Sequence, residues 1–192
     1  MKHIHILKIA YLSVTVIFTH VTSIAYAFEF KANTLLYISP NDYNYSVHLL
    51  HPYYDYWFEQ GPLVEPIALK ALKASNNDTA ICKANETADT IIRVKPSLFY
   101  NPQLRVYHSK LVATMYSGGG NLLGTYVGEA QQLGFNSVDV GITNSLNKVY
   151  TLAMQDLMSK IKADPVPAST GTGNKLPCGL IGAQAEPIIN FY

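Results

Sequence analysis

Three long runs in the middle of the chain carry the residue types of β-strands. Isoleucine, valine, threonine, tyrosine and leucine dominate Asp89 to Tyr100, Leu104 to Ser117 and Asn121 to Leu133. The connections between the runs are short, and Gly118-Gly119-Gly120 supplies residues that accept a positive φ in a tight hairpin. The pattern therefore predicts an antiparallel meander of three strands.

Two further segments predict shorter strands. Phe28 to Pro40 fits a first strand, and Thr79 to Lys83 fits a short one. Pro96 interrupts the first strand of the meander. Because proline cannot donate a hydrogen bond to a ladder, we expect Pro96 at a sheet edge or at a bulge.

Apolar residues spaced three and four apart predict two helices. The first follows Pro62, which suits the first turn of a helix, and runs from Leu63 to Leu72. The second is the clearest in the chain. It runs from Leu146 to Ile161, with Thr143 or Asn144 as its N-cap, and its apolar face must be buried.

This order of elements predicts the α+β class, as a two-layer sandwich in which two helices pack on an antiparallel meander sheet. We expect this domain to occupy residues 28–162. Residues 163–192 begin with the composition of a linker rich in proline and glycine. The last apolar part, Leu176 to Tyr192, is expected to dock back on the domain.

Residues 1–27 have the three parts of a secretory signal peptide. Lys2 and Lys8 give a positive start, Ile9 to Phe18 is largely apolar, and Ala25-Tyr26-Ala27 matches a cleavage site. The alternative is a retained membrane anchor, since the apolar segment approaches the roughly 20 residues that span a bilayer. Polar residues dilute that segment, so we expect cleavage and export.

The charge of the chain excludes two classes of protein. The 192 residues are 48% hydrophobic and hold 14 Lys and Arg against 13 Asp and Glu, a formal charge of +1. A disordered chain has low hydrophobicity and a high net charge, and a nucleic-acid-binding protein has clustered basic residues. Arg93 and Arg105 are the only arginines, so we expect no nucleic-acid partner.

Cys82 and Cys178 are the only cysteines. In an exported chain an even pair favours a disulfide. It would close a loop of about 95 residues and stabilise the fold by at most about 4–5 kcal/mol. Two unpaired thiols are the alternative, because separation along the chain says nothing about the distance between the Cα atoms. No cysteine lies near the predicted cleavage site, so the bacterial lipoprotein route is closed to the chain as written.

An unusual aromatic stretch follows the first predicted strand. It is interrupted by Pro52 and ends at Gly61-Pro62, so we expect a loop. Tyrosine and tryptophan combine an apolar face with a polar tip and are enriched at protein and membrane interfaces. The alternative is a loop that folds over the sheet edge as extra core. The candidate binding residues are Tyr43, Tyr45, Tyr53, Tyr54, Tyr56, Trp57 and Phe58.

Patterns of catalysis or metal binding are sparse. Asp55 and Glu59 lie four residues apart among aromatic residues, an arrangement that a glycosidase could use. His48 and His51 lack a third metal ligand. Ser145 begins a Ser-x-x-Lys sequence, but the companion motifs are absent, and the capping turn of a helix explains it more simply. We expect no catalytic residue, metal or cofactor.

The meander and the last helix resemble small α+β envelope proteins of Gram-negative bacteria, the YajG-like lipoproteins and the auxiliary lipoproteins of lipid-transport systems. The resemblance rests on Asp89 to Val94, Leu111 to Leu123 and Ala153 to Met158, and covers roughly Leu63 to Ile161. It implies a periplasmic or outer-membrane-associated, non-catalytic protein that binds envelope proteins or lipids. The chain lacks the lipid-attachment cysteine of this group, and the aromatic stretch and the Cys178 tail lie outside the resemblance.

The sequence thus predicts an exported binding module of the periplasm or cell envelope. The meander is its scaffold, and the aromatic stretch contacts a protein or lipid partner. Peripheral contact with a membrane is compatible with this reading. Two alternatives are a small periplasmic glycan hydrolase that uses Asp55 and Glu59, and a surface or adhesin subunit that polymerises through its tail.

Overall fold

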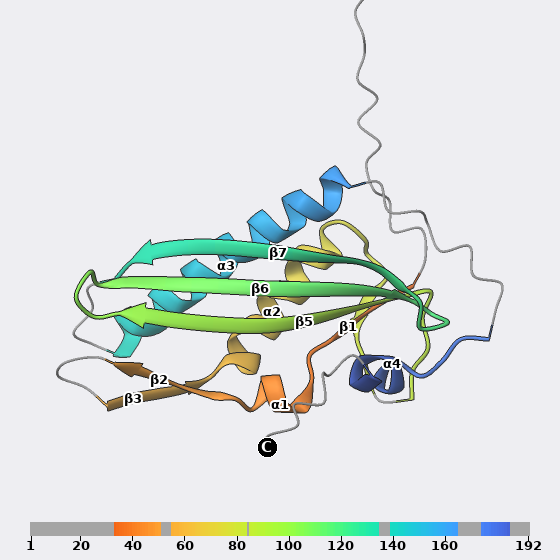
Figure 1. The fold of residues 1–192 in the computed structure, drawn as a ribbon, viewed down its shortest axis with the longest axis horizontal. Helices are drawn as coiled ribbons and strands as arrows, with labels where there is room; N and C mark the ends of the chain where they lie inside the picture. Colours follow the sequence, from red (N-terminus) through yellow and green to blue (C-terminus); the bar gives the residue numbers. More distant parts are fainter. Residues whose placement is uncertain (1–32, 51–54, 84, 135–138, 165–173, 185–192) are drawn as a thin grey trace, which may run out of the picture.

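The computed structural model describes residues 33–50, 55–83, 85–134, 139–164 and 174–184. Five strands form one sheet in the order β4-β1-β5-β6-β7 (Figure 1). The α+β class predicted from the sequence is confirmed. The strands of the sheet are β1 Thr34–Tyr37, β4 Thr79–Ile81, β5 Thr90–Asn101, β6 Val106–Ser117 and β7 Leu122–Leu133.

Two long helices cover one face of the sheet, α2 Gln60–Lys73 and α3 Asp139–Ala163. Both lie behind the strands in Figure 1. A second sheet has two strands, β2 Ser46–Leu50 and β3 Asp55–Glu59, which form a hairpin beside β5. Two short helices complete the described elements, α1 Pro40–Tyr43 and α4 Cys178–Gln184.

The predicted antiparallel meander is confirmed. β5 pairs with β6 over their full lengths, and β6 pairs with β7 with one irregularity between Met115 and Tyr116. Gly120 has a φ of 87° in the turn between β6 and β7, a conformation that glycine adopts without strain. Pro96 lies beyond the end of β1, which pairs only with Thr90 to Arg93. The expected edge position of this proline is therefore correct.

The sheet is mixed, which corrects the expectation of a wholly antiparallel one. β1 runs parallel to both β4 and β5. Parallel neighbours need a long crossover, and α2 supplies it between β1 and β4. The first strand is also shorter than expected, with Thr34 as its first residue, and residues 28–32 lie outside the described part of the chain.

The main core lies between the sheet and the two long helices. Successive side chains of a strand point to opposite faces, so Leu36 and Ile92 face α2 and α3 while Leu35 and Ile91 face the other way. Burial of this kind stabilises the fold by about 25 cal/mol per Å² of apolar surface. Core residues from the helices are Val64, Ala68, Leu72, Tyr150, Ala153, Met154, Leu157 and Ile161.

The predicted disulfide between Cys82 and Cys178 is present, with the Cα atoms 6.0 Å apart. It holds α4 against the opposite face of the sheet, where Leu35 and Ile91 pack around Cys178. The docking expected of the C-terminal apolar segment is thus seen for α4, and residues 185–192 lie outside the described part. Residues 1–27, the predicted signal peptide, lie outside it as well. Among the described helices, none is both long enough and apolar enough to cross a bilayer.

The start of the last long helix differs from the prediction. α3 begins at Asp139, so Thr143 and Asn144 lie inside the helix and do not cap it. Ser145 is also a buried residue inside the helix, so it does not lie in a capping turn as expected. The apolar pattern extends one turn further than predicted, because the buried Ile142 lies four residues before Leu146 and packs with Tyr107.

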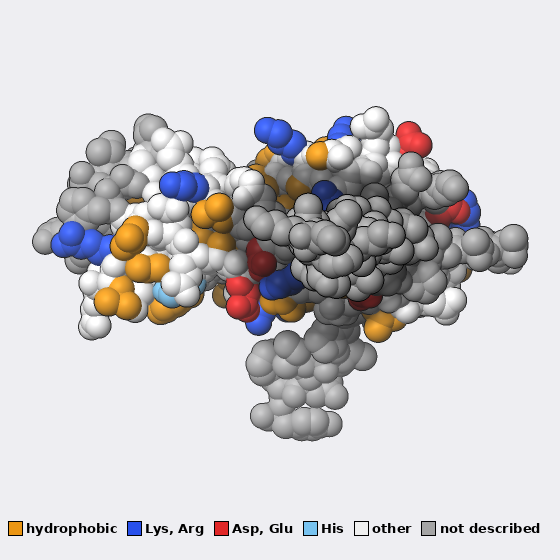
Figure 2. Space-filling view, turned by 90° about the horizontal axis from the view of Figure 1, so that it is seen from above, with side chains coloured by type: hydrophobic (Ala, Val, Ile, Leu, Met, Phe, Trp, Pro, Cys, Tyr) orange, Lys and Arg blue, Asp and Glu red, His pale blue; other side chains and the backbone are white. Residues whose placement is uncertain are grey.

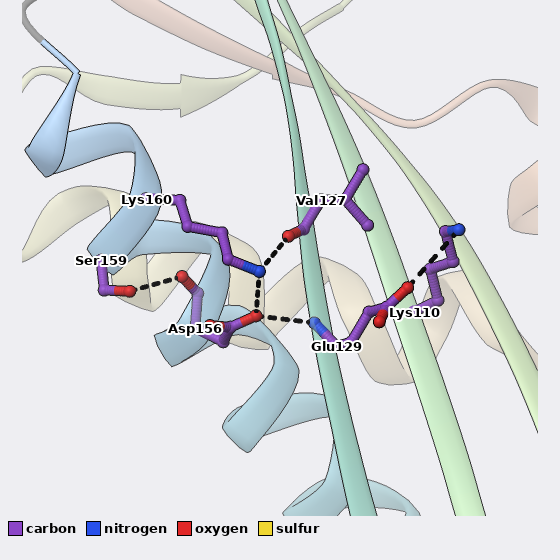
Figure 3. Close-up of polar contacts among 6 residues, drawn as sticks. All are labelled: Lys110, Val127, Glu129, Asp156, Ser159 and Lys160. Carbon is purple, nitrogen blue, oxygen red and sulfur yellow. Dashed lines mark hydrogen bonds and ion pairs between the residues drawn. The ribbon is translucent and has the colours of Figure 1, made fainter.

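Side chains of α3 occupy part of the free edge of β7 (Figure 3). Asp156 Oδ2 accepts a hydrogen bond from the backbone N–H of Glu129 at 2.9 Å, and Lys160 Nζ donates to the carbonyl of Val127 at 2.8 Å. The two side chains also pair with each other at 2.7 Å. Hydrogen bonds from Lys160 and Glu129 lower the pKa of Asp156. The centre of this sheet edge is therefore already hydrogen-bonded.

Candidate interaction surface

The aromatic stretch folds as a hairpin, where the sequence predicted a loop. β2 and β3 pair antiparallel from Ser46 opposite Glu59 to Leu50 opposite Asp55. Every second residue of β3 is exposed, and the residues between are half-buried. The hairpin thus has an inward and an outward face. Aromatic residues on both faces hide the alternation of apolar and polar residues that predicts a strand.

The inward face fixes the hairpin to the rest of the fold. Leu49 is fully buried in a second core with Tyr107 and Ile142, and Tyr56 and Phe58 pack against it. Tyr56 Oη lies 3.4 Å from Thr143 Oγ1 in α3. The sequence left open whether the aromatic stretch adds to the core. The inward face of the hairpin does so, since Leu49, Tyr56 and Phe58 pack in the second core.

The outward face carries an ordered cluster of His48, Asp55 and Trp57. The His48 and Trp57 rings stack with their centroids 4.4 Å apart and their planes 9° apart. Asp55 Oδ1 accepts a hydrogen bond from Trp57 Nε1 at 2.9 Å and lies 2.8 Å from His48 Nε2. The indole is nevertheless 57% exposed. A large aromatic ring is held in place while most of its surface stays in water.

The seven candidate binding residues fall into three groups. Tyr45 and Trp57 are exposed, with Tyr45 at 61%. Tyr43 is half-buried against Gly61, whose lack of a side chain admits the ring. Tyr56 and Phe58 face the core. Tyr53 and Tyr54 lie outside the described residues.

Asp55 and Glu59 do not form the close pair considered for a glycosidase. Both are exposed and stand at opposite ends of β3. A strand rises about 3.3 Å per residue, so four steps separate their Cα atoms by about 13 Å. The carboxyl groups of retaining and inverting glycosidases lie about 5 to 9.5 Å apart. Asp55 is instead engaged with His48 and Trp57.

Metal ligands do not gather in the described part of the chain, where no three residues among His, Cys, Asp and Glu lie close enough to hold an ion. His51, considered together with His48, lies outside that part. His48 has a carboxylate and an indole as neighbours. The candidate surface therefore offers stacking, hydrogen bonding and negative charge.

Buried polar contacts hold the ends of the hairpin. Arg93 Nη2 of β5 lies 3.5 Å from Asp42 Oδ2 of α1, just before the hairpin. Just after it, Gln60 Oε1 accepts a hydrogen bond of 2.8 Å from the Tyr150 hydroxyl of α3. Burial raises the pKa of Tyr150, which keeps this phenol protonated and able to donate.

The link between His48, Asp55 and Trp57 was missed by sequence reasoning. A period of two was present, since Val47 and Leu49 on one strand and Tyr56 and Phe58 on the other are the inward residues. Reading the two runs as paired strands places His48 opposite Trp57. Pro52 and the run of aromatics favoured a loop instead.

No known sequence family and no curated protein matches the chain. Three solved structures are similar in part. A protein of the family DUF330 from Xanthomonas campestris has 9% identity and a TM-score of 0.49 over 68% of this chain and 84% of its own. An uncharacterised protein has 9% identity and a TM-score of 0.44 over 67% and 92%.

The third similar structure is a candidate lipoprotein from Caulobacter crescentus, with 12% identity and a TM-score of 0.34 over 58% of this chain and 83% of its own. Likeness at these identities and TM-scores identifies neither a family nor a function.

Proposed function

We propose that the chain is an exported, non-catalytic binding protein that recognises a protein partner through the outward face of the β2–β3 hairpin. One observation carries this proposal: Trp57 is 57% exposed although a stacked ring and a hydrogen bond fix its position. Exposed but ordered aromatic side chains lose little entropy on binding and supply much of the affinity at protein interfaces. Tyr45 adds a second exposed aromatic ring just before β2.

Charge favours a basic partner. Residues 32–69 contain Asp42, Asp55, Glu59 and Glu65 and no lysine or arginine. An anionic lipid surface would be repelled by this region. A lysine or arginine of a protein partner can pair with Asp55 and lie over the indole of Trp57. The hairpin thus fits a protein whose contact surface presents basic side chains.

The disulfide supports a location outside the cytoplasm, because such bonds persist in oxidising compartments. Together with the signal peptide predicted for residues 1–27, it supports a periplasmic or cell-envelope location. The proposal includes a relationship to the YajG-like and transport-auxiliary lipoproteins, which the sequences of the meander and α3 resemble.

The test compares Trp57→Ala with Leu122→Ala, since the two side chains have similar exposure, 57% and 63%, and only Trp57 lies on the hairpin. Immobilised protein captures partners from the envelope fraction of the producing cell, and the purified partner is then titrated against each variant. Trp57→Ala should weaken binding at least about tenfold, as truncation of an interface anchor does. Leu122→Ala should bind like the wild type. Equal weakening in both variants, or no captured protein, would contradict the proposal.

A further inference from the structure

Three large apolar side chains stand exposed at the end of the sheet that holds the β5–β6 turn. Phe99 is 57% exposed, Leu104 65% and Leu133 73%. They come from β5, the turn and β7, and we call them the apolar tip. This turn lies at one extreme of the molecule's long axis in Figure 1. Gathered apolar side chains in water mark a contact surface more often than scattered ones do.

The apolar tip is held in a defined shape. Asn101 Oδ1 accepts hydrogen bonds from the backbone N–H groups of Gln103 and Leu104, at 3.0 and 3.1 Å. Arg105 has a φ of 55°, in the left-handed region that a tight turn demands. The N–H of Gly134 donates to the carbonyl of Arg105 at 2.9 Å, which ties the end of β7 to the turn. Leu104 and Leu133 are thereby kept on one end of the fold.

Two exposed cations lie nearest the apolar tip, Arg105 in the turn and Lys110 in β6. Residues 95–128 contain Lys95, Arg105 and Lys110 and no aspartate or glutamate, and the next residue, Glu129, pairs with Lys110. Lys95, Arg105 and Lys110 are exposed. Figure 2 shows blue cationic groups among the orange hydrophobic side chains at this end, on the left of the view. This segment is net positive, whereas the segment of residues 32–69 is net negative.

A shallow polar hollow adjoins the apolar tip. It has a volume of about 470 Å³, and Ser97, Phe99, His108, Lys110 and Gln131 line it. The one acidic residue of its lining, Glu129, pairs with Lys110 at 3.5 Å. Hydroxyl, imidazole, ammonium and amide groups can all donate hydrogen bonds to phosphate oxygens.

We propose that the apolar tip is a peripheral membrane contact that inserts into the surface of a bilayer with anionic phospholipid headgroups. Leucine and phenylalanine have no polar end, which suits the boundary between headgroups and acyl chains. The neighbouring cations attract anionic headgroups, and the hollow beside them accepts a lipid phosphate. A protruding turn at the end of a rigid sheet reaches a flat surface without rearrangement. The contact does not use the outward face of the hairpin, although the inward face of the hairpin packs beside it through Leu49.

Vesicle sedimentation of the disulfide-bonded protein tests the proposal. Vesicles of equal parts phosphatidylglycerol and phosphatidylcholine should bind the protein at low ionic strength, and vesicles of phosphatidylcholine alone should bind it far less. The double variant Leu104→Ser, Leu133→Ser should lose binding. The double variant Arg105→Gln, Lys110→Gln should bind at least about twentyfold more weakly, about fivefold for each charge removed.

Leu122→Ser is the matched control, because Leu122 is 63% exposed at the opposite end of β7. It should bind vesicles like the wild type. Thermal unfolding of every variant confirms that the fold is retained. Equal binding to neutral and anionic vesicles, unchanged binding by the tip variants, or an equal loss in Leu122→Ser would overturn the proposal. Wild-type protein that stays in solution with every vesicle would overturn it too.

Discussion

Tyrosine hydroxyls of α3 and β7 join neighbouring elements of the molecule. Tyr150 of α3 donates to Gln60 at the start of α2, and Tyr126 of β7 donates to Asp164 just after α3, at 3.0 Å. A net hydrogen bond contributes only about 1 kcal/mol, but a buried group left without its partner costs more. These residues therefore fix positions as well as contributing stability.

Tyr150→Phe should lower the free energy of unfolding by about 1–3 kcal/mol, because it leaves the buried Gln60 amide without its donor. Urea unfolding followed by circular dichroism measures this loss. The double variant Tyr150→Phe, Gln60→Met removes both polar groups and should recover most of it. If Tyr150→Phe is as stable as the wild type, this contact does not help to position α2.

Alkaline pH should destabilise the fold through its buried phenols. Burial raises the pKa of Tyr107 and of Tyr126 from 10.0 to about 12. The folded state keeps these groups protonated after the unfolded state has begun to lose the proton. Stability is therefore full below pH 10 and falls as the pH rises from 10 to about 12.

Urea midpoints at a series of pH values measure this fall. Tyr107→Phe removes one of the phenols with a raised pKa and should flatten the pH dependence, with the native state otherwise intact. Two results contradict the assignment: a midpoint that holds constant over this range, or a pH dependence that Tyr107→Phe leaves unchanged.

Among the elements, β7 depends on α3 for the protection of its edge. An unpaired strand edge can add a strand from another molecule. Asp156 and Lys160 satisfy the N–H of Glu129 and the carbonyl of Val127 at the centre of that edge. Exposed ion pairs add less than about 1 kcal/mol to stability, so the main role of this pair is to block pairing.

The double variant Asp156→Ala, Lys160→Ala should remain folded, lose at most about 1 kcal/mol of stability, and associate at concentrations where the wild type is a monomer. Light scattering after size-exclusion chromatography detects the association. Lys162→Ala removes an exposed charge from the same helix and should not associate. Association of Lys162→Ala to the same degree would show that lost charge, and not the opened edge, is responsible.

Local patterns predicted the elements whose pairing is also local. β5, β6 and β7 follow one another through short turns, and the apolar spacing of α3 is regular, so both could be read from the sequence. The parallel position of β1 depends on β4 and β5, which lie more than forty residues further along the chain. No local signal encodes that pairing. The site was predicted only in part, because cross-strand partners such as His48 and Trp57 are defined by the hairpin register.

At the scale of the whole molecule, the two proposed contact surfaces differ in their local charge. The acidic hairpin presents Trp57 and Tyr45, and the basic sheet end presents the apolar tip. The disulfide pins α4 to the face of the sheet opposite α2 and α3, which adds a third layer at the other end of the strands. Such a bond typically stabilises a fold by about 2–4 kcal/mol. A stable frame lets each surface act without rearrangement.

Photo-crosslinking in the producing cell tests the central claim, that the hairpin face meets a protein partner. A photoreactive amino acid replaces Tyr45 in one variant and Leu122 in another, two positions with closely matched exposure of 61% and 63%. The account predicts a discrete crosslinked protein from position 45, absent from position 122 and lost when Trp57→Ala is added. The same adducts from both positions, or an adduct at position 45 that persists in Trp57→Ala, would contradict it.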